Sequence, residues 1–108
     1  MMQMNQVQQR IEQIEQCADD AMAAIRSGNV PDDLKQSVKE MHSKARDAKQ
    51  MCGRQVDETQ VVQTVDDLEQ YGDRAVQACR RAGNVDPQVQ SAVQRAHDEI
   101  SDLKKQLH

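Results

Sequence analysis

Apolar and small side chains recur every three or four residues through most of this chain, with polar residues between them. This spacing puts the apolar side chains on one stripe of an α-helix, as heptad a and d positions do. The pattern predicts four helices, over about Met4 to Ser27, Asp32 to Met51, Glu58 to Ala82 and Pro87 to Leu107. The positions predicted to face a core are Met4, Val7, Ile11, Ile14, Ala18, Ala21, Ile25, Leu34, Val38, Met41, Ala45, Ala48, Cys52, Val61, Val65, Leu68, Gly72, Ala75, Cys79, Ala82, Val89, Val93, Ala96, Ile100, Leu103 and Leu107.

The tripeptide Gly-Asn-Val occurs twice, at Gly28–Val30 and at Gly83–Val85, and a proline follows soon after each copy. Glycine takes the left-handed conformation that ends many helices, and proline suits the first turn of the next one. Each copy therefore predicts the turn of a helical hairpin. Residues 53–56 form a short linker between the two hairpins.

Acidic residues mark three of the predicted helix starts. Asp32 and Asp33 lie in a first turn, where negative charge favours the helix dipole. Asp57, with Gln60 three residues later, has the form of a capping box, and Asp86 is placed to cap the last helix.

The second half of the chain repeats the first. Before the turn the matching residues are 54 apart, and after it they are 55 apart. We interpret this as a tandem duplication, with repeats at about residues 4–52 and 58–107; the alternative is chance similarity of two amphipathic hairpins, which the shared turn and histidine disfavour. The matches are Glu15 with Glu69, Gln16 with Gln70, Asp19 with Asp73, Ala21 with Ala75, Ala24 with Ala78, Arg26 with Arg80, Val38 with Val93, His42 with His97, Asp47 with Asp102 and Lys49 with Lys104.

One hairpin alone would leave its apolar stripe in water, whereas two stacked hairpins bury both stripes. We therefore expect residues 1–108 to form one all-α domain, an antiparallel up-down-up-down four-helix bundle. Gly72 falls opposite Ala96, so this level of the bundle is thin. It predicts either a close helix contact or a small cavity.

Composition agrees with close helix packing and limits the partners. Aromatic residues make up 1% of the chain, with Tyr71 alone, so the core consists of aliphatic side chains. Charged residues make up 30%, mixed in sign, with a net charge of −4, which disfavours a nucleic-acid interface. No segment has the form of a signal peptide or a membrane span. Three cysteines without metal or redox spacing suggest reduced thiols in a cytoplasmic protein.

Two histidines are the most suggestive polar residues, because His42 and His97 occupy the same position in each repeat, beside the core stripe. Glu15 and Glu69 lie at the same kind of flanking position, and we expect Glu15 to face His42 and Glu69 to face His97. A carboxylate beside a histidine favours the imidazolium, which would make the bundle sensitive to pH near neutrality. The alternative is a pair of ordinary interhelical contacts, and it carries the greater weight.

Metal binding and catalysis have little support. Metal sites in helical bundles use a Glu three residues before each His, and this chain has Lys39 and Gln94 there. Cys52 and Cys79 lie on core stripes and Cys17 flanks one, as structural thiols do. No strained turn exposes a nucleophile. We expect no enzyme activity, no cofactor and no metal.

Surface positions suggest binding to protein. Met22 and its repeat equivalent Val76 flank the core stripe and predict an apolar edge for a partner helix. Many side chains between Gln3 and Gln16 form a polar, uncharged helix face, which is compatible with self-association. The main hypothesis is a non-catalytic helical protein that binds a protein partner or itself as a homo-oligomer. The alternative is a bundle that binds a small ligand or metal in the thin layer near Tyr71, Gly72, Ala96 and His97.

Overall fold

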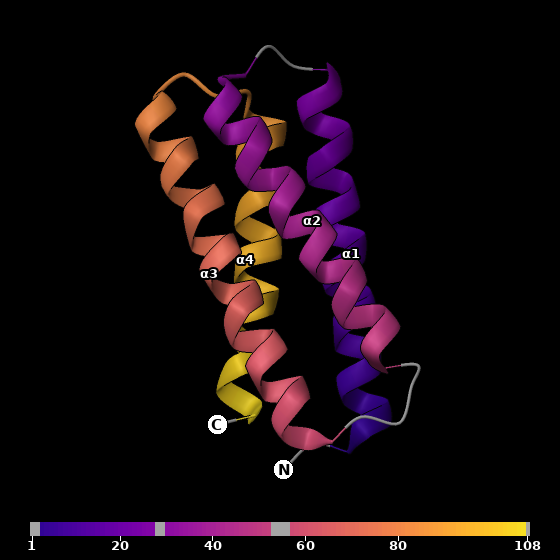
Figure 1. Ribbon diagram of the computed structural model, residues 1–108. Coiled ribbons are helices and arrows are strands. Elements are labelled where there is room, and N and C mark those ends of the chain that lie inside the picture. The colour runs from indigo at the N-terminus through magenta and orange to yellow at the C-terminus, as the bar shows by residue number, and fades with distance from the viewer. Residues whose placement is uncertain (1–2, 28–29, 53–56, 108) are drawn as a thin grey trace.

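The computed structural model describes residues 3–27, 30–52 and 57–107. The described residues form four helices, α1 (Met4–Ser27), α2 (Asp32–Cys52), α3 (Glu58–Ala82) and α4 (Pro87–Leu107) (Figure 1). These bounds match the predicted helices to within a residue. The expected turn at Gly28 and Asn29 and the linker at residues 53–56 lie outside the described residues, as do the side chains of Met4 and Cys52.

Each helix packs against two neighbours, and we name each line of contact a seam. The seams are α1/α2, α2/α3, α3/α4 and α1/α4. The connection from α3 to α4 lies at the same end as the last turn of α1, and both termini lie at the other end (Figure 1). The fold is therefore the predicted all-α, up-down-up-down four-helix bundle, 41 × 21 × 17 Å across. None of the described helices combines the length and apolar character needed to cross a membrane.

The caps follow the predicted chemistry. The Asp57 carboxylate accepts a hydrogen bond from the backbone N–H of Gln60 at 2.9 Å, and α3 begins at the next residue. Asp86 accepts from the backbone N–H of Gln88 at 2.8 Å, so that α4 begins at Pro87. Gly83 ends α3 with a φ of +73°, a backbone conformation that residues with a side chain rarely adopt.

The predicted stripe forms the core. Every described member is buried except Ala82 and Leu107, which are half-buried at helix ends. The core is wider on α3 than the stripe predicts, because Val76 and Ala78 beside it are also buried. Thr64 is buried as well, and its hydroxyl donates to the carbonyl of Gln60 at 2.8 Å, which satisfies the polar group.

The thin layer at Gly72 is a close helix contact. A Cβ added at Gly72 would lie 3.4 Å from Cδ1 of Ile100 and 3.5 Å from Cδ2 of His97. The side chains of α4 therefore occupy the space beside Gly72. The repeat equivalent of Gly72 is Ala18, which is fully buried between its neighbours.

Candidate functional site

Each hairpin carries a histidine–aspartate bridge across its seam. His42 on α2 is hydrogen-bonded to Asp19 on α1, and Nε2 of His97 on α4 lies 2.6 Å from Oδ1 of Asp73 on α3. The two bridges join equivalent residues of the two repeats. Both rings are largely covered, whereas the aspartates are about half exposed.

Each hairpin also carries a lysine–glutamate pair further from its turn. Lys49 Nζ lies 3.4 Å from Glu15, and Lys104 Nζ lies 2.8 Å from Glu69. The hydrogen bond from Lys104 to Glu69 raises the pKa of the lysine, and the negative charge of nearby Asp66 acts in the same direction. These four residues are again repeat equivalents.

The structure thus gives the histidines different partners from those predicted. The carboxylate beside His42 belongs to Asp19, one helical turn nearer the hairpin turn than Glu15. Side chains in a helix lean toward its N-terminus, which for α2 and α4 is the end at the turn. His42 therefore reaches toward the turn and meets Asp19, and the longer Lys49 reaches Glu15.

These charged pairs do not converge on one site. The bridge of His42 lies on the α1/α2 seam and that of His97 on the α3/α4 seam. Within the described parts of the chain, no three His, Cys, Asp or Glu side chains are placed to hold a metal ion. The arrangement can tie the two helices of each hairpin together.

Tyr71 and His97 also lie toward different helices. The guanidinium of Arg74 lies over the Tyr71 ring, 5.3 Å from its centroid, and the same Arg74 reaches Glu40 on α2 at 4.0 Å. The predicted ligand position is therefore divided between two seams. Tyr71 lies toward the α2/α3 seam and His97 toward the α3/α4 seam, where Gly72 contacts α4 and Ala96 is fully buried.

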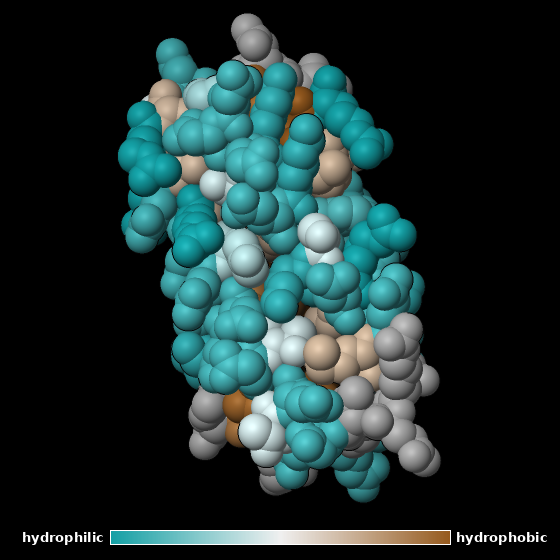
Figure 2. Space-filling view, in the orientation of Figure 1, coloured by the Kyte–Doolittle hydropathy of each residue, from teal (hydrophilic) through white to brown (hydrophobic). Residues whose placement is uncertain are grey.

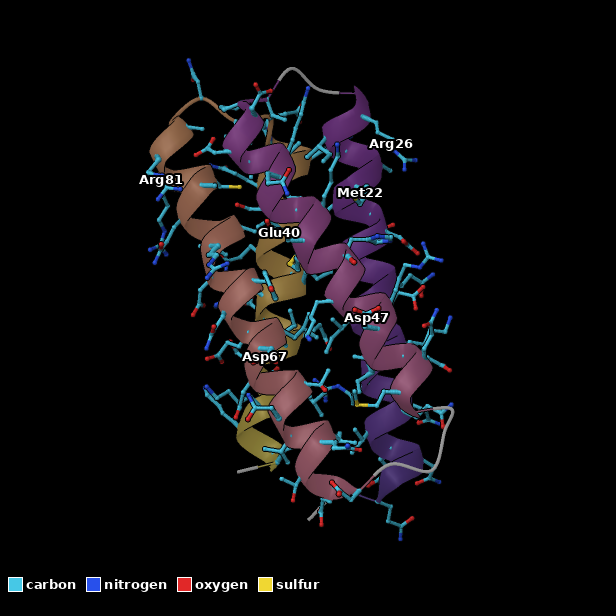
Figure 3. The ribbon with its side chains drawn as sticks, viewed as in Figure 1. Met22, Arg26, Glu40, Asp47, Asp67 and Arg81 are labelled. Carbon is cyan, nitrogen blue, oxygen red and sulfur yellow. The ribbon has the colours of Figure 1, made fainter. Side chains whose placement is uncertain are left out.

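The predicted apolar edge is mostly part of the core. Val76 is only 8% exposed, and Met22 is half-buried and packs against the core cluster (Figure 3). The prediction of a partner-facing edge is therefore wrong for Val76. A position that flanks the stripe is covered when the neighbouring helix packs closely beside it.

One hollow of about 590 Å³ lies on the α2/α3 seam, between the end of α2 and the start of α3. A second hollow region, which the sequence pattern did not indicate, lies along the α1/α4 seam. Two adjoining hollows of about 510 and 300 Å³ follow this seam and share Cys17, Asp20 and Arg95. We call them together the α1/α4 groove. Its lining residues are mostly small or uncharged: Gln13, Gln16, Cys17, Asp20, Ala23 and Ala24 from α1, and Pro87, Gln88, Ser91, Ala92, Arg95 and Glu99 from α4.

The equivalent seam of the other repeat pair, α2/α3, is bridged by charged residues. Among the described residues, three interhelical ion pairs cross it, between Asp33 and Arg81 at 3.4 Å, Glu40 and Arg74 at 4.0 Å, and Lys44 and Asp67 at 3.7 Å. This face is turned toward the viewer in Figure 2, where most of it is hydrophilic and apolar side chains gather near its lower end, and Figure 3 shows Glu40 and Asp67 on it.

Residue exchanges that open the α1/α4 groove can be read from the repeat alignment. Ala23, Ser91 and Ala92 line the groove, whereas the equivalents on α2 and α3 are the longer or more polar residues Gln77, Gln36 and Ser37. Burial differs at a position where the residue is the same in both repeats. Ala24 is half-buried beside the groove, and its equivalent Ala78 is fully buried. A comparison of the flanking positions of the two repeats would have found this signal.

Cys17 contributes a thiol to the lining of the groove. Its side chain is half-buried, and burial raises the pKa of the thiol, assisted by the negative charges of Glu99 and Asp20 and opposed by Arg95. Burial also raises the pKa of the Cys79 thiol in the core. Both thiols are free, and raised pKa values make them poor nucleophiles at neutral pH.

Comparison with protein-family models gave no match, and comparisons with curated proteins and with solved structures gave none either.

Proposed function

We propose that this chain is a non-catalytic, cytoplasmic interaction module, which binds a protein partner or itself through the α1/α4 groove. The observation that carries the proposal is the difference between two equivalent seams. Among the described residues, three ion pairs cross the α2/α3 seam and leave it hollow only near the end of α2, whereas one pair, Arg10 with Glu99, crosses the α1/α4 seam and small side chains leave the rest of that seam open. An exposed hollow lined by small side chains lets another helix approach closely.

The charged pairs of the hairpins support this proposal because they have structural partners. His42, His97, Lys49 and Lys104 each face a carboxylate across a seam within the bundle. A polar group that is satisfied inside its own fold contributes to stability and specificity of packing. The groove, in contrast, presents a mostly uncharged lining to solvent, together with the charged side chains of Asp20 and Arg95.

The test is photo-cross-linking in the cell that makes the chain natively. The photoreactive residue p-benzoylphenylalanine replaces Ser91 in the groove or, as the matched control, its repeat equivalent Gln36 on α2, which is also exposed. We expect irradiation to give a discrete protein adduct with the probe at Ser91 and none with the probe at Gln36. The absence of an adduct from Ser91, or equal adducts from both positions, would overturn the proposal.

A further inference from the structure

We infer that the α1/α4 groove binds a second copy of this chain, in a two-fold dimer whose axis runs parallel to the helices. In this arrangement α1 of one protomer packs against α4 of its partner. The inference rests on the proposed function and names the partner.

Charge complementarity within the groove selects this partner and this orientation. Asp20 lies on the α1 wall and Arg95 on the α4 wall, and both line both hollows. Neither side chain has an ion-pair partner among the residues that the structure describes. Each wall therefore offers one unpaired charge, and the two charges have opposite sign.

A two-fold axis parallel to the helices places the α1 wall of one protomer opposite the α4 wall of the other at the same height. Asp20 then faces Arg95 of the partner subunit, and the same pair forms twice. A two-fold axis perpendicular to the helices would set Asp20 against its own copy, which like-charge repulsion disfavours. The groove is thus self-complementary in one orientation only.

The rest of the groove suits close packing of helices. Ala23, Ala24 and Ala92 on its walls are small, so that facing helix axes can approach to about 8–10 Å. Glu99, the remaining charged residue of the lining, already pairs with Arg10 at 3.1 Å, so that no further unpaired charge would be buried.

The size of the face is adequate for a dimer. The molecule is 41 Å long and 21 Å wide, so one face offers on the order of 800 Å², about what each partner of a stable dimer buries. By comparison, the charged α2/α3 face would bury three ion pairs that already have partners. This cost disfavours the opposite face as the dimer interface.

Sedimentation velocity of the purified full chain over a range of concentrations tests the inference. We expect a reversible dimer. Asp20→Arg or Arg95→Asp should each raise the dissociation constant at least about tenfold, because like charges then meet twice. Asp47→Arg, which makes the same change of charge on α2 (Figure 3), should leave the dissociation constant unchanged.

Two further samples test the orientation and guard against misfolded variants. The double swap D20R/R95D should dimerise again, and a mixture of the two single variants should form a heterodimer. Circular dichroism confirms that each variant is helical. Dimerisation that Asp20→Arg and Arg95→Asp do not weaken, or a double swap that stays monomeric, would overturn the inference.

Sedimentation velocity also distinguishes failure of the dimer from failure of the proposed function. If the wild-type chain sediments as a monomer at every concentration, the second copy is not the partner. The proposed function then stands or falls with the photo-cross-link at Ser91, whose adduct mass shows whether a different protein occupies the groove.

Discussion

The imidazole Nε2 of His97 lies 2.6 Å from Oδ1 of Asp73, and His42 meets Asp19 at the same level of the other hairpin. The bridge is thus present in both repeats, as is the lysine–glutamate pair below it. Such repetition indicates that these pairs fix how the helices of a hairpin align along their length. The apolar stripe alone would also allow one helix of a hairpin to shift along the other by one heptad.

A double-mutant cycle measures the contribution of each bridge. We expect Asp73→Ala and His97→Ala, separately and combined, to give a coupling free energy of about 0.5–1 kcal/mol, because the aspartate is about half exposed and solvent screens the pair. Urea denaturation at pH 6 supplies the free energies of unfolding. The cycle of Asp19 with His42 is the matched comparison and should agree. Coupling within experimental error of zero in both hairpins would show that the bridges do not align the helices.

Most of the fold could be predicted because its signals are local. The caps at Asp57 and Asp86 and the spacing of apolar residues depend on a few neighbouring positions, and the structure confirms them. The repeat of the hairpin pattern then led to the prediction that two hairpins stack on each other. The stripe does not reveal how widely each helix is covered, and for this reason the burial of Val76 was missed.

The contacts between helices were harder to predict. The heptad position gave the correct seam for His42 but not the correct height, since the direction in which side chains lean decides between Glu15 and Asp19. The groove was missed for a different reason. It arises from residues that differ between the repeats, such as Ala23 and its equivalent Gln77, whereas the predicted fold depends on the residues that the repeats share.

Gly72 within α3 and Gly83, which caps the end of α3, should respond oppositely to replacement by alanine. Gly72→Ala should raise the free energy of unfolding by about 0.5–1 kcal/mol, because alanine favours helix and its Cβ would meet only ordinary contacts at 3.4 Å or more. Gly83→Ala should lower it by about 1 kcal/mol, because the φ of +73° strains any residue with a Cβ.

Thermal and urea unfolding of the two glycine variants provide the measurement, each compared with the wild type. Ala18, the equivalent of Gly72 in the first repeat, shows that the fold accepts a methyl group at this level. If Gly72→Ala destabilised the chain instead, the contact of α3 with His97 and Ile100 would be closer than its geometry indicates.

Alkaline pH should destabilise the fold in two steps. Burial raises the pKa of the Cys17 and Cys79 thiols above the ordinary 9.0, so the unfolded chain loses these protons first and the unfolded state is favoured as the pH rises above 9.0. The pKa of Lys104 is raised above 10.5, so its bond to Glu69 stabilises the fold below that pH and is lost as the pH rises through the raised pKa.

Urea unfolding at a series of pH values from neutral to strongly alkaline resolves the two steps. A variant with Cys17→Ala and Cys79→Ala should lose the first step and keep the second, whereas Lys104→Met should do the reverse. Stability that stayed constant through the first step in the wild type would contradict the raised thiol pKa values.

Thiol labelling should report the groove and the core separately. In a Cys52→Ser background, and at a concentration low enough to keep the chain monomeric, a chromogenic disulfide reagent should modify Cys17 first, because Cys17 is half-buried on the α1/α4 seam and Cys79 is 5% exposed. Both reactions should be slower at neutral pH than that of a free thiol, since raised pKa values reduce the thiolate fraction. Cys79 should react only through opening of the bundle, so its rate should rise with added urea while that of Cys17 changes little. Equal rates for the two thiols in the absence of urea would mean that the groove does not expose Cys17.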